Sequence, residues 1–341
     1  MTRPLVPLAA GSATALVDRY DAGLLDLDGV VYIGPSPVPY AAESLAQARA
    51  RGMRLAFVTN NASRTPKTVA EHLTELGVAA DASEVATSGQ AAARLVAGLV
   101  APGSAVLVVG GGALEEALIE RGLRPVHSAD DGPSAVVQGY HPSVGWVQLA
   151  EGTFAVRAGL PWVATNTDLT IPTPRGIGPG NGTLVNVIRQ ASGAEPLVAG
   201  KPELALHQES IDRVAAERPL IIGDRLDTDI EGAVRAGTAS LLVLTGVTGP
   251  AELLAAQPSC RPTYLAADLR GLLTAPADVV FDGGDLALGG WTARVQAGRL
   301  RLTGAGDPVD ALRVACVATW GYPEEVDTRE VVVRLAAEHA G

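Results

Sequence analysis

The stretch GLLDLDGVVY, residues 23–32, places two carboxylates, Asp26 and Asp28, directly after a short apolar run. Carboxylates at the end of a buried strand are costly unless they are paired or bind a metal ion. Two such acids can divide their work, because one can bind a metal and attack while its neighbour carries a proton. The stretch therefore predicts a reactive site at the end of a strand.

Further apolar runs rich in Val, Leu and Ile end in polar or glycine residues and are followed by helical patterns. The runs lie at residues 23–25, 55–58, 196–199, 220–222 and 241–244. Continuous apolar strands that alternate with helices indicate a parallel sheet covered on both faces. One helix is clearly marked by Thr65 and Pro66 at its start and Gly77 after its end. We therefore expect an α/β fold with a doubly wound parallel sheet.

Polar side chains follow these strands at the sheet edge where ligands bind in such folds. They are Asp26, Asp28, Thr59, Asn60, Asn61, Lys201, Asp224 and Asp229. Converging carboxylates favour a hard cation such as Mg²⁺. Hydroxyl, amide and lysine groups suit a phosphate, whose three peripheral oxygens must be held together. For each residue alone, helix capping, turn formation or a surface position is an alternative.

A second α/β pattern lies between the motifs at Asn61 and Lys201. Its predicted strands are 105–109, 135–138 and 162–164, and its predicted helices are 113–121 and 144–158. The glycine- and proline-rich segment 165–185 then leads back to the core and suits a hinge or a substrate-facing loop. We expect this insertion to fold as a cap on the core.

After residue 272 short alternating runs between glycine turns predict antiparallel hairpins. Two helices are expected to follow, the first beginning at Asp307 and the second with a capping box of Asp327 and Glu330. The hairpins and helices resemble part of an acyltransferase fold, without an acyl-CoA pyrophosphate loop. We interpret this region as serving packing, oligomerisation or regulation.

Composition narrows the possible partners and the location. The formal net charge of −11 leaves no broad cationic surface for nucleic acid. No apolar run approaches the roughly 20 residues that span a bilayer, and Pro4, Pro7 and Gly11 interrupt any signal-peptide core. Cys260 and Cys316 form neither a disulfide framework nor a metal cluster, which favours buried thiols in a cytoplasmic protein.

The motifs occur in the order DLDGV, VTNNAS, GKP and GDRLDTD, with the insertion between the second and third. This order resembles the haloacid dehalogenase (HAD) superfamily, and specifically its NagD-type branch of 4-nitrophenylphosphatases and phosphoglycolate or glycerol-3-phosphate phosphatases. The resemblance covers roughly residues 20–270. It implies a Rossmann-like core at 1–89 and 196–271, a C2-type α/β cap at 90–195 and an additional α+β region at 272–341.

The resemblance also implies a role for each motif residue. Asp26 matches the nucleophile that becomes an aspartyl-phosphate, and Asp28 matches the general acid and base. Thr59, Asn60 and Asn61 match the phosphate-binding turn, and Lys201 matches the residue that steadies nucleophile and phosphoryl group. Asp26, Asp224 and the Asp28 carbonyl match the Mg²⁺ ligands, and Asp229 matches an acid that acts through water or by orienting its neighbours.

The expected function is Mg²⁺-dependent hydrolysis of a small phosphate monoester, with glycerol 3-phosphate or 2-phosphoglycolate as favoured substrates and a homodimer as one assembly. The alternatives are a nucleotide or pyridoxal phosphate phosphatase and a signalling module that keeps its phosphate. A dinucleotide enzyme is a further alternative, because VLVVGGGALEEAL at residues 106–118 is partly similar to a Gly-rich fingerprint. The third glycine of that fingerprint is missing, which favours a tight turn.

Overall fold

The computed structural model describes residues 7–173 and 175–339, so Pro4 of the early segment lies outside the described residues. The chain forms two compact units. The first comprises residues 1–55, 76–78 and 216–341, and the second comprises residues 56–75 and 79–215. Among the described helices, none is long and apolar enough to cross a membrane.

The first unit contains parallel strands in the order β15-β14-β13-β1. Their bounds are β1 (Ala22–Asp26), β13 (Pro219–Gly223), β14 (Ala239–Val243) and β15 (Tyr264–Ala266). These strands form because their apolar side chains are buried on both faces of the sheet. Leu25 pairs with Ile222, so β1 and β13 end at the same edge. The predicted runs 23–25 and 220–222 are confirmed as strands with slightly wider bounds, and the run 241–244 is confirmed as a strand that begins at Ala239 and ends at Val243.

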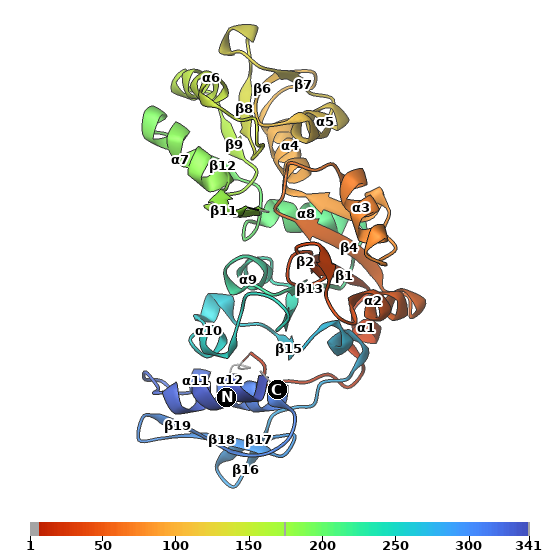
Figure 1. Ribbon diagram of the computed structural model, residues 1–341, viewed down its shortest axis with the longest axis vertical. Coiled ribbons are helices and arrows are strands. Elements are labelled where there is room, and N and C mark those ends of the chain that lie inside the picture. The colour runs from red at the N-terminus through yellow and green to blue at the C-terminus, as the bar shows by residue number, and fades with distance from the viewer. Residues whose placement is uncertain (1–6, 174, 340–341) are drawn as a thin grey trace. The chain divides into compact units, whose positions relative to one another are not determined.

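Short helices and turns complete this part of the first unit (Figure 1). They are α1 (Leu16–Arg19), α2 (Ala41–Ala50), η3 (Leu226–Ile230), α9 (Glu231–Arg235), α10 (Pro250–Leu254), η4 (Pro258–Cys260), η5 (Leu269–Leu273) and the hairpin of β2 (Tyr32–Ile33) and β3 (Ser36–Pro37). The chain leaves this unit within β4 (Arg54–Thr59). At the start of β4, the Arg54 N–H donates to the Asp21 carbonyl at 3.0 Å.

The second unit receives the end of β4, where Thr59 pairs with Thr87 of β5 (Val85–Thr87). It also holds a parallel sheet in the order β12-β9-β8-β6-β7. The strands of this sheet are β6 (Ala105–Val109), β7 (Arg124–Val126), β8 (Ala135–Gln138), β9 (Trp162–Ala164) and β12 (Leu197–Val198). The three strands predicted in the insertion are confirmed with the same bounds.

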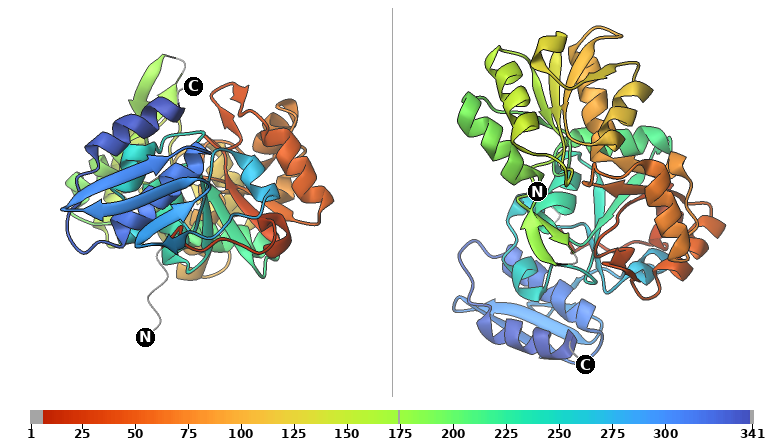
Figure 2. Two further views of the ribbon diagram at one scale, coloured as in Figure 1. Left: turned by 90° about the horizontal axis from the view of Figure 1, so that it is seen from below. Right: turned by 45° about the horizontal axis from the view of Figure 1, so that its top comes forward.

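Helices cover both faces of this sheet, with α4 and α5 on one side and α6 and α7 on the other (Figure 2). The helices of the unit are α3 (Pro66–Glu75), α4 (Ser88–Leu99), α5 (Gly112–Glu120), α6 (Trp146–Arg157), α7 (Asn181–Ser192) and α8 (Leu204–Arg213), with short turns η1 (Ala82–Glu84) and η2 (Ala129–Asp131). The segment 165–185 contains the hairpin of β10 (Thr170–Thr173) and β11 (Gly176–Pro179). The predicted helices 113–121 and 144–158 are confirmed to within two residues.

One predicted strand has a different partner. The run 196–199 was expected in the same sheet as 23–25, but β12 is an edge strand beside β9, with Val198 opposite Ala164. The Ala199 N–H extends this pairing by donating to the Ala164 carbonyl at 2.9 Å. A run this short carries too little pattern to specify its partner strand, which long-range pairing decides.

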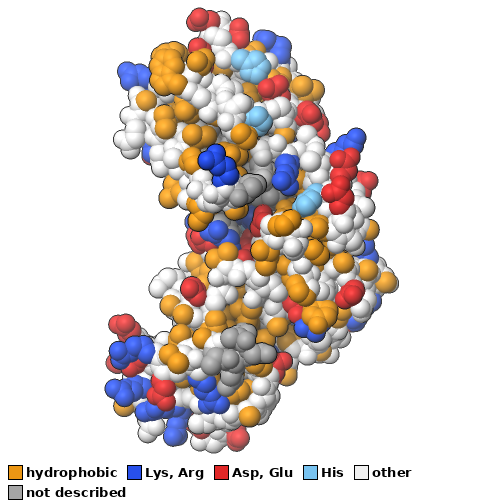
Figure 3. Space-filling view, viewed as in Figure 1, with side chains coloured by type: hydrophobic (Ala, Val, Ile, Leu, Met, Phe, Trp, Pro, Cys, Tyr) orange, Lys and Arg blue, Asp and Glu red, His pale blue; other side chains and the backbone are white. Residues whose placement is uncertain are grey.

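The C-terminal region forms the predicted antiparallel sheet, in the order β16-β17-β18-β19. Its elements are β16 (Val280–Asp282), β17 (Asp285–Leu288), β18 (Trp291–Gln296), β19 (Arg299–Gly304), α11 (Pro308–Trp320) and α12 (Arg329–His339). Asp307 caps α11 as expected, since its carboxylate accepts from the Val309 N–H at 2.8 Å. Basic and acidic side chains alternate over this region in Figure 3.

The capping box predicted for the last helix is wrong. The Glu330 carboxylate accepts from Arg301 at 2.9 Å, and the Asp327 N–H donates to the Gly298 carbonyl at 2.8 Å. Asp327 still accepts from the Arg329 N–H at 3.2 Å. Contacts with β19 and its preceding turn therefore replace the local reciprocal pair.

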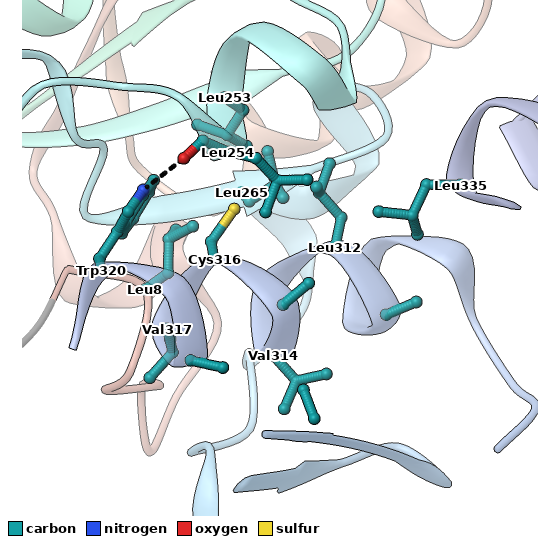
Figure 4. Packing of buried hydrophobic residues seen from close by; sticks show 14 of the residues in the cluster. Leu8, Leu253, Leu254, Leu265, Leu312, Val314, Cys316, Val317, Trp320 and Leu335 are labelled. Carbon is teal, nitrogen blue, oxygen red and sulfur yellow. Dashed lines mark hydrogen bonds between the residues drawn. The ribbon is translucent and has the colours of Figure 1, made fainter. Parts of the chain in front are cut away.

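The C-terminal region shares one hydrophobic core with the parallel strands of the first unit. Leu312 and Cys316 of α11 lie in the same cluster as Leu254 and Leu265 (Figure 4). The Trp320 indole N–H donates to the Leu254 carbonyl at 3.2 Å. Cys316 is buried as predicted, whereas Cys260 is only half-buried in η4.

Candidate active site

Three carboxylates converge at the sheet edge of the first unit. Asp26 ends β1, Asp224 directly follows β13, and Asp229 lies in η3. One oxygen from each lies within 4.8 Å of the others. Asp224 and Asp229 are each 1% exposed, and Asp26 is half-buried. Neighbouring strand ends thus bring together acids that are about 200 residues apart in the sequence.

Main-chain groups and glycines fix these carboxylates. Asp224 Oδ2 accepts from the Val247 N–H at 2.7 Å, and Asp229 Oδ2 accepts from the Arg225 N–H at 3.2 Å. Gly223 lies against Asp229, because a Cβ built there would be 2.2–2.4 Å from its side-chain atoms. The backbone therefore approaches the acids more closely than any larger residue would allow.

The donor set fits a divalent cation such as Mg²⁺. Carboxylate oxygens are the ligands that hard cations prefer. Three carboxylates within 4.8 Å repel one another when ionised, and a divalent cation between them would offset that repulsion. The geometry thus supports a metal site at the end of β1.

Asp28 lies on a turn just beyond this cluster and is exposed. The Leu27 carbonyl accepts from the Val31 N–H at 2.9 Å, and the Gly29 N–H donates to the Tyr32 carbonyl at 2.8 Å. Gly29 has φ of +82°, which glycine adopts without strain. Within the described residues, the acids close enough to share one ion are Asp26, Asp224 and Asp229, and the Asp28 carboxylate is not a member of this set.

The second unit brings together Thr59, Asn60, Asn61 and Lys201. Thr59 is 6% exposed, and its hydroxyl oxygen accepts from the Asn61 N–H at 3.1 Å. Asn61 Oδ1 accepts from the Ser63 N–H at 2.8 Å, which closes the turn after β4. The Asn61 side chain therefore shapes the turn.

Asn60 connects this turn to the Lys201 loop. Its Oδ1 accepts from the Lys201 N–H at 2.8 Å, and its Nδ2 donates to the Lys201 carbonyl at 3.3 Å. Gly200 permits the approach, because a Cβ there would lie 2.6 Å from Asn60 Oδ1. Lys201 is 5% exposed. Together with the Thr165 carbonyl, this contact leaves no room for a side chain at the glycine of the GKP motif.

Sequence reasoning did not assign positioning roles to Ser88, Asn166 and Asn181. Ser88 Oγ and Asn166 Nδ2 both donate to the Asn60 carbonyl, at 2.5 and 2.7 Å. Asn181 Nδ2 donates to the Asn166 carbonyl at 2.7 Å. Asn166 and Asn181 lie in the segment 165–185, which was predicted as a hinge or a substrate-facing loop.

Family models match most of the chain. Residues 23–124 match a model described as haloacid dehalogenase-like hydrolase, and residues 198–272 match a HAD-hydrolase-like model. Residues 288–341 match a GCN5-related N-acetyltransferase like domain. The acyltransferase likeness of the C-terminal region is therefore also found by this comparison.

The chain is also similar to individual proteins of known name. The D-glycerol 3-phosphate phosphatase of Mycobacterium tuberculosis is 50% identical over 258 residues, which are 76% of this chain and 72% of the relative. A crystal structure of glycerol phosphate phosphatase from that organism, in complex with magnesium, superposes with a TM-score of 0.87 at 42% identity, covering 96% of this chain and 99% of that one. The crystal structure of a 4-nitrophenylphosphatase from Thermotoga maritima superposes with a TM-score of 0.69 at 28% identity. The match covers 76% of this chain and 98% of that one.

Proposed function

The chain belongs to the haloacid dehalogenase-like hydrolases, and on that premise we propose that it is a Mg²⁺-dependent phosphatase of small phosphate monoesters. The observation that carries this proposal is the convergence of Asp26, Asp224 and Asp229 within 4.8 Å at the end of β1. As the substrate we propose D-glycerol 3-phosphate, because the 50% identical relative is a phosphatase for that compound. The second candidate is 2-phosphoglycolate.

In this proposal, the Asp26 and Asp224 carboxylates and the Asp28 main-chain carbonyl hold Mg²⁺, and Asp229 orients this set. When bound, the ion neutralises charge on the phosphoryl oxygens. By the family resemblance, Lys201 and the turn at Thr59 and Asn60 would bind phosphate oxygens. The Thr59 hydroxyl suits this task, because its oxygen accepts from the Asn61 N–H and its own hydrogen can be donated.

The reaction has two steps. An Asp26 oxygen attacks phosphorus, the bond from phosphorus to the ester oxygen breaks, and that oxygen takes the proton of Asp28. Asp28 then accepts a proton from water, whose oxygen attacks phosphorus and releases inorganic phosphate from Asp26. The exposure of Asp28 suits it to both proton transfers, because it can meet the leaving group and water.

The proposal extends to organisation and location. Residues 1–89 and 196–271 would form the catalytic core, 90–195 the cap and 272–341 an accessory region. The partner would be the substrate, without nucleic acid or membrane, in a cytoplasmic homodimer. The free thiols of Cys260 and Cys316 support a location in the reducing cytoplasm. Light scattering would measure the molar mass and so test the proposed homodimer.

A phosphate-release assay tests the function. Purified full-length protein with Mg²⁺ is offered D-glycerol 3-phosphate, 2-phosphoglycolate, a nucleoside monophosphate and pyridoxal phosphate. We expect the first to be preferred and Asp26→Asn to reduce its turnover at least about 10³-fold. Robust turnover by Asp26→Asn would contradict the mechanism, and a phosphoprotein that persists for minutes would indicate a signalling module instead.

A further inference from the structure

We propose that Asn166, which lies outside the four motifs, is a positioning residue for phosphate binding and acts through the main chain of Asn60. This inference rests on the proposed function, because it concerns the turn that would hold the phosphoryl group. Asn166 is 5% exposed and directs its Nδ2 to the Asn60 carbonyl at 2.7 Å. The two residues are 106 positions apart in the sequence, and both belong to the second unit.

The Asn60 carbonyl belongs to the peptide group that also carries the Asn61 N–H. Ser88 Oγ and Asn166 Nδ2 donate to the carbonyl oxygen of this peptide group. At its other end, the Asn61 N–H donates to Thr59 Oγ1 at 3.1 Å. Rotating this peptide would break all three hydrogen bonds, so Asn166 and Ser88 fix the orientation of the Thr59 hydroxyl.

The same residue transmits the constraint to the lysine loop. The Asn60 side chain accepts from the Lys201 N–H at 2.8 Å and donates to the Lys201 carbonyl at 3.3 Å. Displacing the Asn60 main chain would therefore also displace the main chain of Lys201. A hydrogen bond from Asn166 thus constrains both groups that are proposed to hold phosphate oxygens.

Asn166 is itself held at both its side chain and its main chain. Its Oδ1 accepts from the Asp168 N–H at 3.1 Å, and its main-chain carbonyl accepts from Asn181 Nδ2 at 2.7 Å. Asn181 is 1% exposed at the start of α7. Since Oδ1 faces an N–H donor, Nδ2 is the atom that faces the Asn60 carbonyl. An aspartate at position 166 would keep the acceptor and replace the donor by a repelling oxygen.

The decisive variant is therefore Asn166→Asp, which preserves side-chain shape. Isothermal titration with inorganic phosphate in Mg²⁺ buffer measures the turn directly, and steady-state kinetics measure turnover of D-glycerol 3-phosphate. We expect phosphate affinity to fall about tenfold or more, and kcat/KM to fall about 100-fold, since small misplacements of positioning groups have effects of this size. Melting temperature is recorded for every variant.

Asn186→Asp is the matched control, because it makes the same chemical change on α7. The Asn186 side chain accepts a hydrogen bond from Arg189, and Asn186 takes part in none of the hydrogen bonds described above for the turn after β4. Phosphate affinity and kcat/KM of this variant should stay within about twofold of wild type, since the half-buried aspartate keeps the oxygen that accepts from Arg189. The comparison separates the lost hydrogen bond from the added charge.

Ser88→Ala gives a second, uncharged perturbation of the same carbonyl. If both residues act through the Asn60 carbonyl, the effects of Ser88→Ala and Asn166→Asp on phosphate affinity should be non-additive by at least about twofold. If Asn166→Asp does not fold, Ser88→Ala carries the test by itself. Unchanged phosphate binding and turnover by the folded variant overturn the proposal, even if its melting temperature falls.

The outcomes also separate this proposal from the proposed function. A wild-type protein that binds inorganic phosphate but hydrolyses no ester contradicts the function, and the phosphate affinity of Asn166→Asp still decides the positioning role. Wild-type turnover with an unaffected Asn166→Asp overturns only the positioning role. A wild-type protein that neither binds inorganic phosphate nor hydrolyses any of the esters overturns both.

Discussion

The carboxylate of Asp224 leaves no room for a side chain at Gly246. A Cβ built on Gly246 would lie 1.9 Å from Asp224 Oδ2, far inside van der Waals contact. The next residue, Val247, donates its N–H to the same oxygen at 2.7 Å. The loop after β14 therefore sets the position of Asp224 by direct contact of its main chain.

Gly246→Ala should weaken the proposed Mg²⁺ site, because the new methyl group must displace the Asp224 carboxylate. We expect the Mg²⁺ concentration for half-maximal activity to rise about tenfold or more, as is typical when the support of a metal ligand is disturbed. Gly98→Ala is the control, since no atom lies within 4 Å of a Cβ at that position. Equal Mg²⁺ dependence of the two variants would refute the expected role of the contact.

Asp28→Asn should affect substrates according to their leaving groups. An alkoxide leaving from glycerol 3-phosphate needs a proton, whereas 4-nitrophenolate leaves readily without one. We expect general-acid loss to lower the first-step rate on glycerol 3-phosphate about 10²–10⁴-fold and that on 4-nitrophenyl phosphate much less. Single-turnover phosphorylation by rapid quench isolates this step, and equal losses on both substrates would exclude proton donation by Asp28.

Glu209→Gln should destabilise the second unit. The Glu209 side chain is 5% exposed and pairs with Arg94, Arg121 and Arg213, at 3.4, 2.8 and 3.0 Å. Breaking a buried ion pair costs about 3–5 kcal/mol, and partial exposure of two of these arginines favours the lower end. Urea unfolding measures the loss.

The control for this measurement is Glu195→Gln. Glu195 pairs with Arg189 at 2.7 Å, but its side chain is 72% exposed. Such a surface pair contributes about 0–1 kcal/mol. A loss for Glu209→Gln no larger than that for Glu195→Gln would show that the buried cluster adds nothing to the free energy of unfolding.

The Asp21 carboxylate should make the free energy of unfolding decrease at acidic pH. Burial raises the pKa of this carboxyl, but the N–H groups of Glu217 and Arg218 and the charge of Arg54 outweigh it and hold the pKa below 3.8. Because the folded state favours the ionised form, the stabilisation is fully present above the unfolded pKa and is lost as pH falls through the lower folded value.

Asp21→Asn should therefore cost about 1.5–3 kcal/mol at pH 7, the usual range for hydrogen bonds to a charged group. Urea unfolding of both proteins between pH 7 and pH 3 measures the difference. We expect it to be constant down to about pH 5 and to shrink below about pH 4. A difference that grows as the pH falls would have the wrong sign for this carboxyl.

Buried strands and their terminal acids could be predicted because burial leaves a strong local pattern. The run before Asp26 and the run before Asp224 are apolar throughout, and parallel strands place such ends at one edge. Glycines next to the motifs could be seen in the sequence, but not the contacts that require them. Gly246 is explained by the Asp224 side chain that faces it, and Gly200 by the Thr165 carbonyl and the Asn60 side chain.

Other features depend on partners that are distant in the sequence. Asn166 contacts Asn60 across 106 residues, and an isolated asparagine in a loop has many possible partners. Glu330 has the sequence spacing from Asp327 that is typical of a capping box, but its carboxylate accepts from Arg301 of β19 instead. Local rules fail at these positions because tertiary hydrogen bonds compete with them.

The hydrophobic core that α11 shares with the strands of the first unit means that the C-terminal region cannot be removed without exposing apolar side chains. A stop codon after residue 271 would expose Leu253, Leu254 and Leu265, which are at most 5% exposed in the full chain. The truncated protein would expose a contiguous hydrophobic surface and would be prone to aggregate. The Thermotoga maritima 4-nitrophenylphosphatase aligns over 98% of its own length with only 76% of this chain. Shortening this protein to the length of that relative would therefore require polar substitutions on α10 and β15, in addition to deletion of the C-terminal region.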